Sequence, residues 1–120
     1  MKTLKYSFLI LFLVPAFSLI AADQVTGTYD SNWGSVTLKL NGNKVTGTYE
    51  CCGGGTITGT LNGKTITYDW KQPGGYGKGV WTIKQGGKLL DGTWGNGTSS
   101  TAGGKWTLTR KKGKKKKKKR

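Results

Sequence analysis

The middle of this 120-residue chain consists of short runs in which apolar and polar residues alternate, and one of these runs occurs twice. Val-Thr-Gly-Thr-Tyr stands at residues 25–29 and again, letter for letter, at residues 45–49. Alternation with a period of two predicts β-strands that bury one face. We therefore expect eight strands, at residues 25–29, 36–40, 45–49, 56–61, 65–70, 79–84, 89–94 and 105–110.

The connections between these strands alternate in length and composition. Three of them are tight turns built from Asn and Gly, which supply the positive φ angles that hairpin turns need: Asn41-Gly42-Asn43, Asn62-Gly63 and Gln85-Gly86-Gly87. The other connections are longer and rich in Gly and Ser, at residues 30–34, 50–55, 71–78 and 95–104. Because consecutive strands run in opposite directions, we expect one closed end and one open mouth.

Eight sequential strands with one apolar face each can bury that face in an up-and-down barrel or in a sandwich. We favour an all-β, eight-stranded antiparallel barrel, since Gly27, Gly47, Gly59 and Gly92 fall on the apolar face, where glycine lets a coiled strand bend. Thr, Ser and Lys take the outward face. The predicted inward residues are Val25, Tyr29, Val36, Leu38, Leu40, Val45, Tyr49, Ile57, Leu61, Ile66, Tyr68, Trp70, Trp81, Ile83, Leu90, Trp94, Trp106 and Leu108.

The chain divides into a leader, a body and a tail. Residues 1–22 carry Lys2 and Lys5, an apolar stretch from Phe8 to Ile20 and two final alanines, a pattern typical of a signal peptide. A membrane anchor is the rival interpretation, but the stretch is shorter than the roughly 20 residues of a spanning helix. We expect a secreted or periplasmic protein, with a barrel domain at residues 23–109.

Positive charge is concentrated in the tail at residues 110–120. The tail holds ten of the 20 Lys and Arg residues and no acid. Like charges repel, so we expect this segment to be disordered. It is predicted to bind polyanions such as nucleic acid, anionic lipid or acidic glycan, unless it is only a solvated extension. The residues concerned are Lys111, Lys112, Lys114, Lys115, Lys116, Lys117, Lys118, Lys119 and Arg120.

Aromatic residues gather where the mouth is expected. Tyr29, Tyr49, Trp70 and Trp94 are the last inward residues of the odd-numbered strands. Trp33, Tyr76 and Trp81 are expected at the same end. Barrels of this size can enclose one small ligand in a rigid aromatic wall. The alternative is that the rings plug the barrel, because Trp and Tyr suit a half-wet rim.

Several of these residues lie in segments that resemble the avidin and streptavidin family of barrels. The similar segments are Gly27-Thr28-Tyr29-Asp30-Ser31-Asn32-Trp33-Gly34-Ser35, Val45-Thr46-Gly47-Thr48-Tyr49-Glu50, Trp70-Lys71-Gln72 and Trp94. The resemblance implies a calycin-type barrel in which Ser35 and Tyr49 bond the polar head of a ligand while Trp70 and Trp94 hold its apolar part. With Tyr29 and Trp81 from the mouth, these make the candidate ligand-binding set.

The chain also departs from that family. Ser31 stands where the family has Asn, Gly79 falls about where it has a ligand-binding Thr, and the last strand runs into Arg110 and Lys111 without the family's final Asp. The lid loop is replaced by Cys51-Cys52-Gly53-Gly54. These departures argue against biotin as the ligand.

Cys51 and Cys52 are adjacent and are the only cysteines. In an oxidising compartment they can form a vicinal disulfide, pair between chains or stay free. The chain contains no His, and its few acids are scattered, so we expect no metal site, no cofactor and no enzymatic activity.

Three functions are compatible with these features. We first expect a secreted, non-enzymatic barrel that binds a small molecule at its aromatic mouth and associates with anionic surfaces through its tail. The alternative is a structural or surface-interaction protein with a packed barrel that binds polyanions through the tail alone. A third interpretation uses the outward Thr rows to recognise carbohydrate or ice, but a closed barrel lacks the flat face that this requires.

Overall fold

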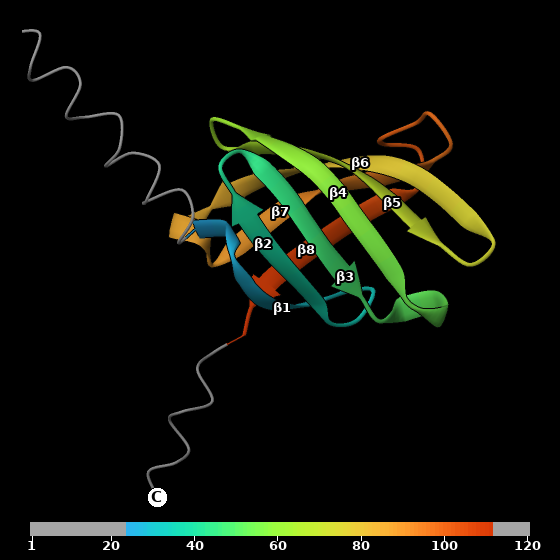
Figure 1. The fold of residues 1–120 in the computed structure, drawn as a ribbon, viewed down its shortest axis with the longest axis horizontal. Helices are drawn as coiled ribbons and strands as arrows, with labels where there is room; N and C mark the ends of the chain where they lie inside the picture. The colour runs from blue at the N-terminus through green and yellow to red at the C-terminus, as the bar shows by residue number, and fades with distance from the viewer. Residues whose placement is uncertain (1–23, 112–120) are drawn as a thin grey trace, which may run out of the picture.

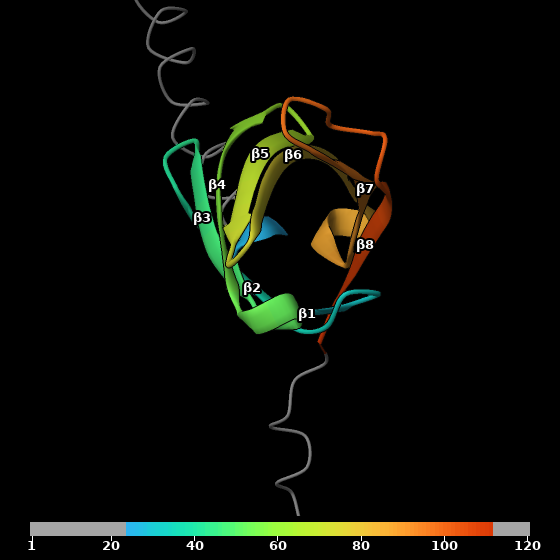
Figure 2. The ribbon, with the colours of Figure 1, turned by 90° about the vertical axis from the view of Figure 1, so that its right-hand side faces the viewer.

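The computed structural model describes residues 24–111, which form one closed antiparallel barrel (Figure 1). The strands pair in sequence order, and β8 pairs with β1 to close the sheet. Figure 2 shows the same strands in a ring. Their bounds are β1 Gly27–Ser31, β2 Val36–Asn41, β3 Lys44–Tyr49, β4 Gly55–Asn62, β5 Thr65–Gln72, β6 Gly75–Lys84, β7 Leu89–Asn96 and β8 Gly104–Arg110, with short 3-10 turns η1 (Cys51–Gly53) and η2 (Gln85–Gly87).

The predicted all-β barrel is confirmed, although several strands begin or end at other residues than predicted. The first strand begins at Gly27 rather than Val25. The sixth begins at Gly75 rather than Gly79, so the predicted long connection at residues 71–78 does not exist. Gln72 pairs with Gly75 across a turn made by Pro73 and Gly74, whose φ of 84° is the conformation that Pro-Gly turns provide. Because β6 starts four residues earlier than predicted, each of its inward residues lies farther from the mouth than predicted.

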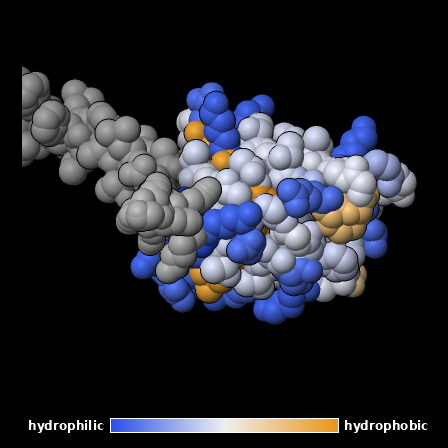
Figure 3. Space-filling model, turned by 90° about the horizontal axis from the view of Figure 1, so that it is seen from below, coloured by the Kyte–Doolittle hydropathy of each residue, from blue (hydrophilic) through white to orange (hydrophobic). Residues whose placement is uncertain are grey.

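The predicted core is confirmed almost completely. Every predicted inward residue is buried except Trp94, which is partly buried and packs against the others. Glycine permits close strand contacts in this core. A Cβ at Gly92 would meet the Val80 carbonyl oxygen and would come within 2.8 Å of the Trp81 Cα. The outward face is largely hydrophilic, as Figure 3 shows for one side, and the large exposed apolar residues of the described chain are Trp33 and Tyr76.

The two ends of the barrel differ as the turn composition predicts. The β2–β3 and β4–β5 turns and η2 lie at the left of Figure 1, whereas η1, the β5–β6 turn and the segment from 97 to 103 lie at the right. Gly42 and Gly63, in two of the left-hand turns, have φ of 68° and 66°. The closed end therefore has the backbone geometry that Asn-Gly turns favour.

Arg110 fastens the seam between β1 and β8 at the closed end. Its Nε donates to the Gly87 carbonyl at 3.0 Å, Nη1 donates to the Thr26 carbonyl at 2.8 Å, and Nη2 donates to the Tyr29 hydroxyl at 2.9 Å. Arg110 belongs to β8, which matches the strand predicted at residues 105–110, although Arg110 was also counted with the tail at residues 110–120. Lys111 is also tied to the barrel, because its N–H donates to the Thr28 carbonyl at 2.9 Å.

The signal peptide predicted at residues 1–22 and the tail residues from Lys112 onward lie outside the described residues. Within residues 24–111, no helix is long and apolar enough to cross a membrane.

Candidate functional site

A pocket of about 160 Å³ opens at the end of the barrel that carries η1. Each of several strands and loops contributes a side chain to it, so the site depends on the closed barrel rather than on one segment. Its surface is mostly apolar. The nine lining residues are Trp33, Tyr49, Cys51, Cys52, Trp70, Gln72, Trp94, Asn96 and Trp106.

The aromatic rings of the pocket meet edge to face. Trp94 lies between Trp33 and Trp70, with ring centroids 5.7 and 5.8 Å away and interplanar angles of 90° and 78°. Tyr49 and Trp106 form a second perpendicular pair, with centroids 5.2 Å apart. Rings at right angles form the corners of a box, whereas parallel rings would stack and fill the space.

A layer of stacked rings lies beneath this box. Tyr68 and Trp81 are parallel within 24°, with centroids only 3.9 Å apart, and both are fully buried. Trp106 contacts both rings edge to face from above. The Trp81 Nε1–H donates to the Trp106 carbonyl at 3.1 Å, which satisfies the deepest indole. The barrel interior is therefore packed directly below the pocket.

Hydrogen bonds to the wall fix most of these side chains. The Trp70 indole donates to the Gly95 carbonyl and the Trp106 indole donates to the Ser31 hydroxyl, each at 3.0 Å. The Tyr49 hydroxyl donates to Gln72 Oε1 at 2.7 Å. The pocket is thus held in shape by its own wall, a condition for binding with little loss of side-chain freedom.

The Trp94 indole differs from the others. Among residues 24–111, its Nε1 is the buried side-chain nitrogen or oxygen atom without a hydrogen-bond partner. Its ring packs against the backbone of the β7–β8 connection, where a Cβ at Gly103 would lie 2.5 Å from Trp94 Cε3. A buried donor without an acceptor is unusual in native proteins and often marks a place where a further group binds.

Cys51 and Cys52 form a disulfide between adjacent residues at the edge of the pocket. The turn that carries them, η1, places Cys52 at a φ of 65°, in the left-handed region. The Gly54 N–H donates to the Cys51 carbonyl at 3.0 Å and closes this turn. Of the arrangements expected for the two cysteines, the structure contains the vicinal bond, and both residues belong to the pocket wall.

Three members of the candidate ligand-binding set, Tyr49, Trp70 and Trp94, lie around this pocket. Ser35 is not among the lining residues. Its hydroxyl accepts a hydrogen bond from Lys111 Nζ at 3.2 Å. The structure therefore does not bring Ser35 together with the pocket residues.

Tyr29 and Trp81 are also misplaced by the sequence prediction. Tyr29 pairs with Arg110, and its hydroxyl donates to the Val25 carbonyl, so its ring lies at the closed end. The stagger of β1 against β8 brings Ser31, rather than Tyr29, to the mouth. Trp81 pairs with Ile66 and Gly92, deeper than the mouth, because β6 begins four residues earlier than predicted.

Trp106, Gln72 and Asn96 line the pocket although the prediction assigned them no role at the site. The direction of the strands could have indicated that Trp106 lies at the mouth. Even-numbered strands start at the mouth, and Trp106 is the first inward residue of β8. Gln72 and Asn96 end strands that the prediction stopped two residues too early.

None of the nine lining side chains is charged. Burial raises the pKa of the Tyr49 hydroxyl above its ordinary value of 10.0, so it stays a neutral donor at physiological pH. Among the described residues, no three His, Cys, Asp or Glu side chains gather in a way that could hold a metal ion. The arrangement is suited to holding a molecule by contact and hydrogen bonding.

No family model, curated protein or solved structure gave a significant match to the chain. The closed eight-stranded antiparallel barrel is consistent with a calycin-like barrel.

Proposed function

We propose that this protein is an exported, non-enzymatic binding protein that holds a small, mostly apolar molecule in the pocket at the open end of its barrel. The observation that carries the proposal is the contrast between the two aromatic layers. Tyr68 and Trp81 stack and exclude any ligand, whereas the five rings above them surround about 160 Å³ of open space. Rings that only plugged the barrel would be expected to close this gap.

The size of the pocket limits the ligand. A cavity of about 150 Å³ lined by apolar side chains can hold benzene, and this pocket has a similar volume. We therefore propose a ligand, or a ligand head group, of about one ring. Two amide side chains, Gln72 and Asn96, are available to orient it.

A divergent relationship with the avidin family is part of this proposal. Tyr49, Trp70 and Trp94, which the resemblance implies as ligand contacts, all line the pocket. Ser35, the other implied polar contact, lies outside it. We accordingly propose a ligand other than biotin.

The first experiment is native mass spectrometry of the mature protein purified from its own host. A bound molecule of defined mass would support the proposal and identify the chemical class of the ligand. Tryptophan fluorescence, with that molecule added, would then be compared in Trp70→Ala, Trp94→Ala and Tyr76→Ala. Tyr76 is the matched control, since it is an exposed ring at the same end that does not line the pocket. A saturable shift unaffected by either Trp substitution would overturn the assignment of the pocket.

A second candidate function rests on the run of basic residues after Lys111. Residues 114–120 are all Lys or Arg. We propose that this segment attaches the protein to polyanions, independently of the pocket. Affinity for immobilised heparin should fall steeply with salt and should disappear when residues 112–120 are removed. Retention that survives this removal would assign polyanion binding to the barrel instead.

A further inference from the structure

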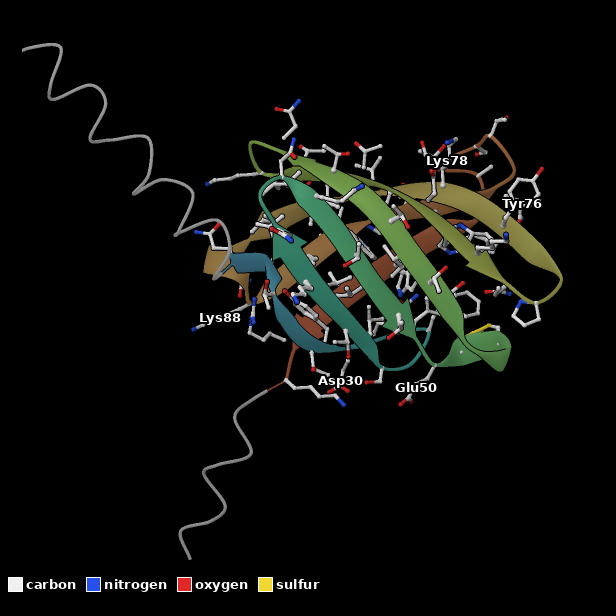
Figure 4. All side chains as sticks on the ribbon, in the orientation of Figure 1. Asp30, Glu50, Tyr76, Lys78 and Lys88 are labelled. Atoms are coloured by element: carbon white, nitrogen blue, oxygen red, sulfur yellow. A yellow bond between two sulfur atoms is a disulfide. The ribbon has the colours of Figure 1, made fainter. Side chains whose placement is uncertain are left out.

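The pocket combines many aromatic faces with an absence of charged side chains. Its wall contains the rings of Trp33, Tyr49, Trp70, Trp94 and Trp106, and no charged residue is among the nine that line it. Glu50 follows Tyr49 in the sequence, but it is exposed and points away from the barrel in Figure 4. Any charge on a ligand in this pocket would therefore be met by aromatic rings rather than by a carboxylate.

Aromatic faces attract cations, and Trp does so most strongly. The attraction is greatest when the cation is removed from water, as it would be inside a box of rings. An ammonium group that carries N–H donors also needs acceptors, because a buried donor without a partner is costly. The wall offers few such acceptors, because indole nitrogens only donate. They are Gln72 Oε1, which already accepts the Tyr49 hydroxyl, and the side-chain oxygen of Asn96.

We propose that the pocket binds a quaternary ammonium group, with the five rings acting as an aromatic cage. A quaternary ammonium has no N–H to satisfy and its charge is spread over methyl groups, so it needs only ring faces and apolar contact. A trimethylammonium head is similar in bulk to the single ring that the pocket volume allows. This inference rests on the proposed function, since it names the ligand class of the same pocket.

The surrounding charges do not prevent this assignment. Lys78 pairs with Asp69 at 2.9 Å, and Asp91 pairs with Lys84 at 3.0 Å and with Lys105 at 3.6 Å. The chain as a whole nevertheless carries a formal net charge of +15. The repulsion that this produces is screened beyond about 8 Å at physiological ionic strength. We therefore expect the affinity for a cation to rise with added salt, opposite to the salt dependence of polyanion binding by the tail.

The decisive test compares choline with 3,3-dimethylbutan-1-ol, which replaces the positive nitrogen by carbon and keeps the shape. Both would be titrated into the full mature chain at physiological salt, with tryptophan fluorescence as the readout. We expect choline to bind about tenfold more tightly than the alcohol. Equal or tighter binding of the alcohol would overturn the inference and leave the proposed small-molecule pocket in place.

Trp94→Phe sharpens the test because the Trp94 Nε1–H has no hydrogen bond to lose. Phe keeps an apolar ring but attracts cations less than Trp does. We expect this variant to weaken choline binding severalfold and to leave alcohol binding nearly unchanged, whereas equal losses for both would show that Trp94 acts by packing alone. If neither compound binds, the inference is wrong. An unrelated molecule carried through purification would then still support the proposed function, and an empty protein would count against it.

Discussion

The guanidinium of Arg110 lies over the ring of Tyr29, 4.9 Å from its centroid, and hydrogen-bonds the hydroxyl of the same residue. The pair joins the end of the last strand to the first strand, across the only junction of the sheet that is not a local hairpin. The closed barrel thus includes a side-chain contact between two residues that are far apart in sequence.

Replacement of Arg110 by Ala is expected to destabilise the barrel by about 3 kcal/mol. The substitution removes hydrogen bonds to the Gly87 and Thr26 carbonyls and to the Tyr29 hydroxyl. The bonds to Gly87 and Tyr29 are partly buried, so these two groups lose a donor where water does not fully replace it. Urea unfolding followed by tryptophan fluorescence measures the change. Lys105→Ala is the control, because Lys105 is exposed and makes one long ion pair, and it should change the free energy of unfolding by less than about 0.5 kcal/mol. Similar small effects of both substitutions would show that Arg110 does not hold the seam.

Gly92→Ala is expected to destabilise the barrel by about 1–3 kcal/mol, the usual range for overpacking. A methyl group there would meet the Val80 carbonyl oxygen of the neighbouring strand, which cannot move without disturbing the sheet. Gly75→Ala is the matched control, since its nearest contact would be an ordinary 3.6 Å approach to Trp70. Thermal unfolding of both variants gives the comparison. Equal melting temperatures would mean that β6 and β7 can separate enough to admit the methyl group.

The barrel was predictable from the sequence because its local signals agree. Alternation identifies the inward face, so residues such as Leu38 and Ile66 could be assigned to the core before the structure was known. Asn-Gly turns identify the closed end. Both signals depend on neighbouring residues alone, and neither requires knowledge of how distant strands are aligned.

The site was less predictable because it depends on the stagger between strands. Tyr29 and Tyr49 close the same repeated sequence, yet Tyr29 lies under Arg110 at the closed end and Tyr49 lines the pocket. The difference comes from the register of β1 against β8, which no local pattern encodes. Trp81 was misplaced for a similar reason, since the Pro73–Gly74 turn that lengthens β6 was taken for part of a loop.

The barrel is expected to lose stability above about pH 10. Burial raises the pKa of Tyr29, Tyr49 and Tyr68 above 10.0. The unfolded chain therefore ionises these hydroxyls first, so the free energy of unfolding is unaffected below that pH and falls as the pH rises further. Urea unfolding at several alkaline pH values measures the slope. The Tyr68→Phe variant should lose stability more gradually than the unmodified protein, because it has one buried phenol fewer to ionise. Lysine deprotonation affects both proteins alike and does not change this comparison. An identical slope would show that Tyr68 ionisation does not contribute.

Reduction of the Cys51–Cys52 disulfide is expected to change binding more than stability. A bond between adjacent residues closes almost no loop, so the chain-entropy effect is small and the free energy of unfolding should change by less than about 1 kcal/mol. Both cysteines nevertheless belong to the pocket wall, and η1 begins two residues after Tyr49. The Cys51→Ser, Cys52→Ser double variant should therefore bind a pocket ligand several times more weakly while unfolding at nearly the same urea concentration.

Alkylation of the unreduced protein, followed by mass spectrometry, is the control for the state of the cysteines. A chain that resists alkylation until it is reduced, and remains monomeric, contains the internal bond. A disulfide-linked dimer would contradict that state, because each sulfur would then be occupied by another chain. If the double variant binds the ligand with unchanged affinity, the prediction that the disulfide affects the pocket is wrong, although the bond itself can still be present. The two measurements thus separate the existence of the bond from its influence on binding.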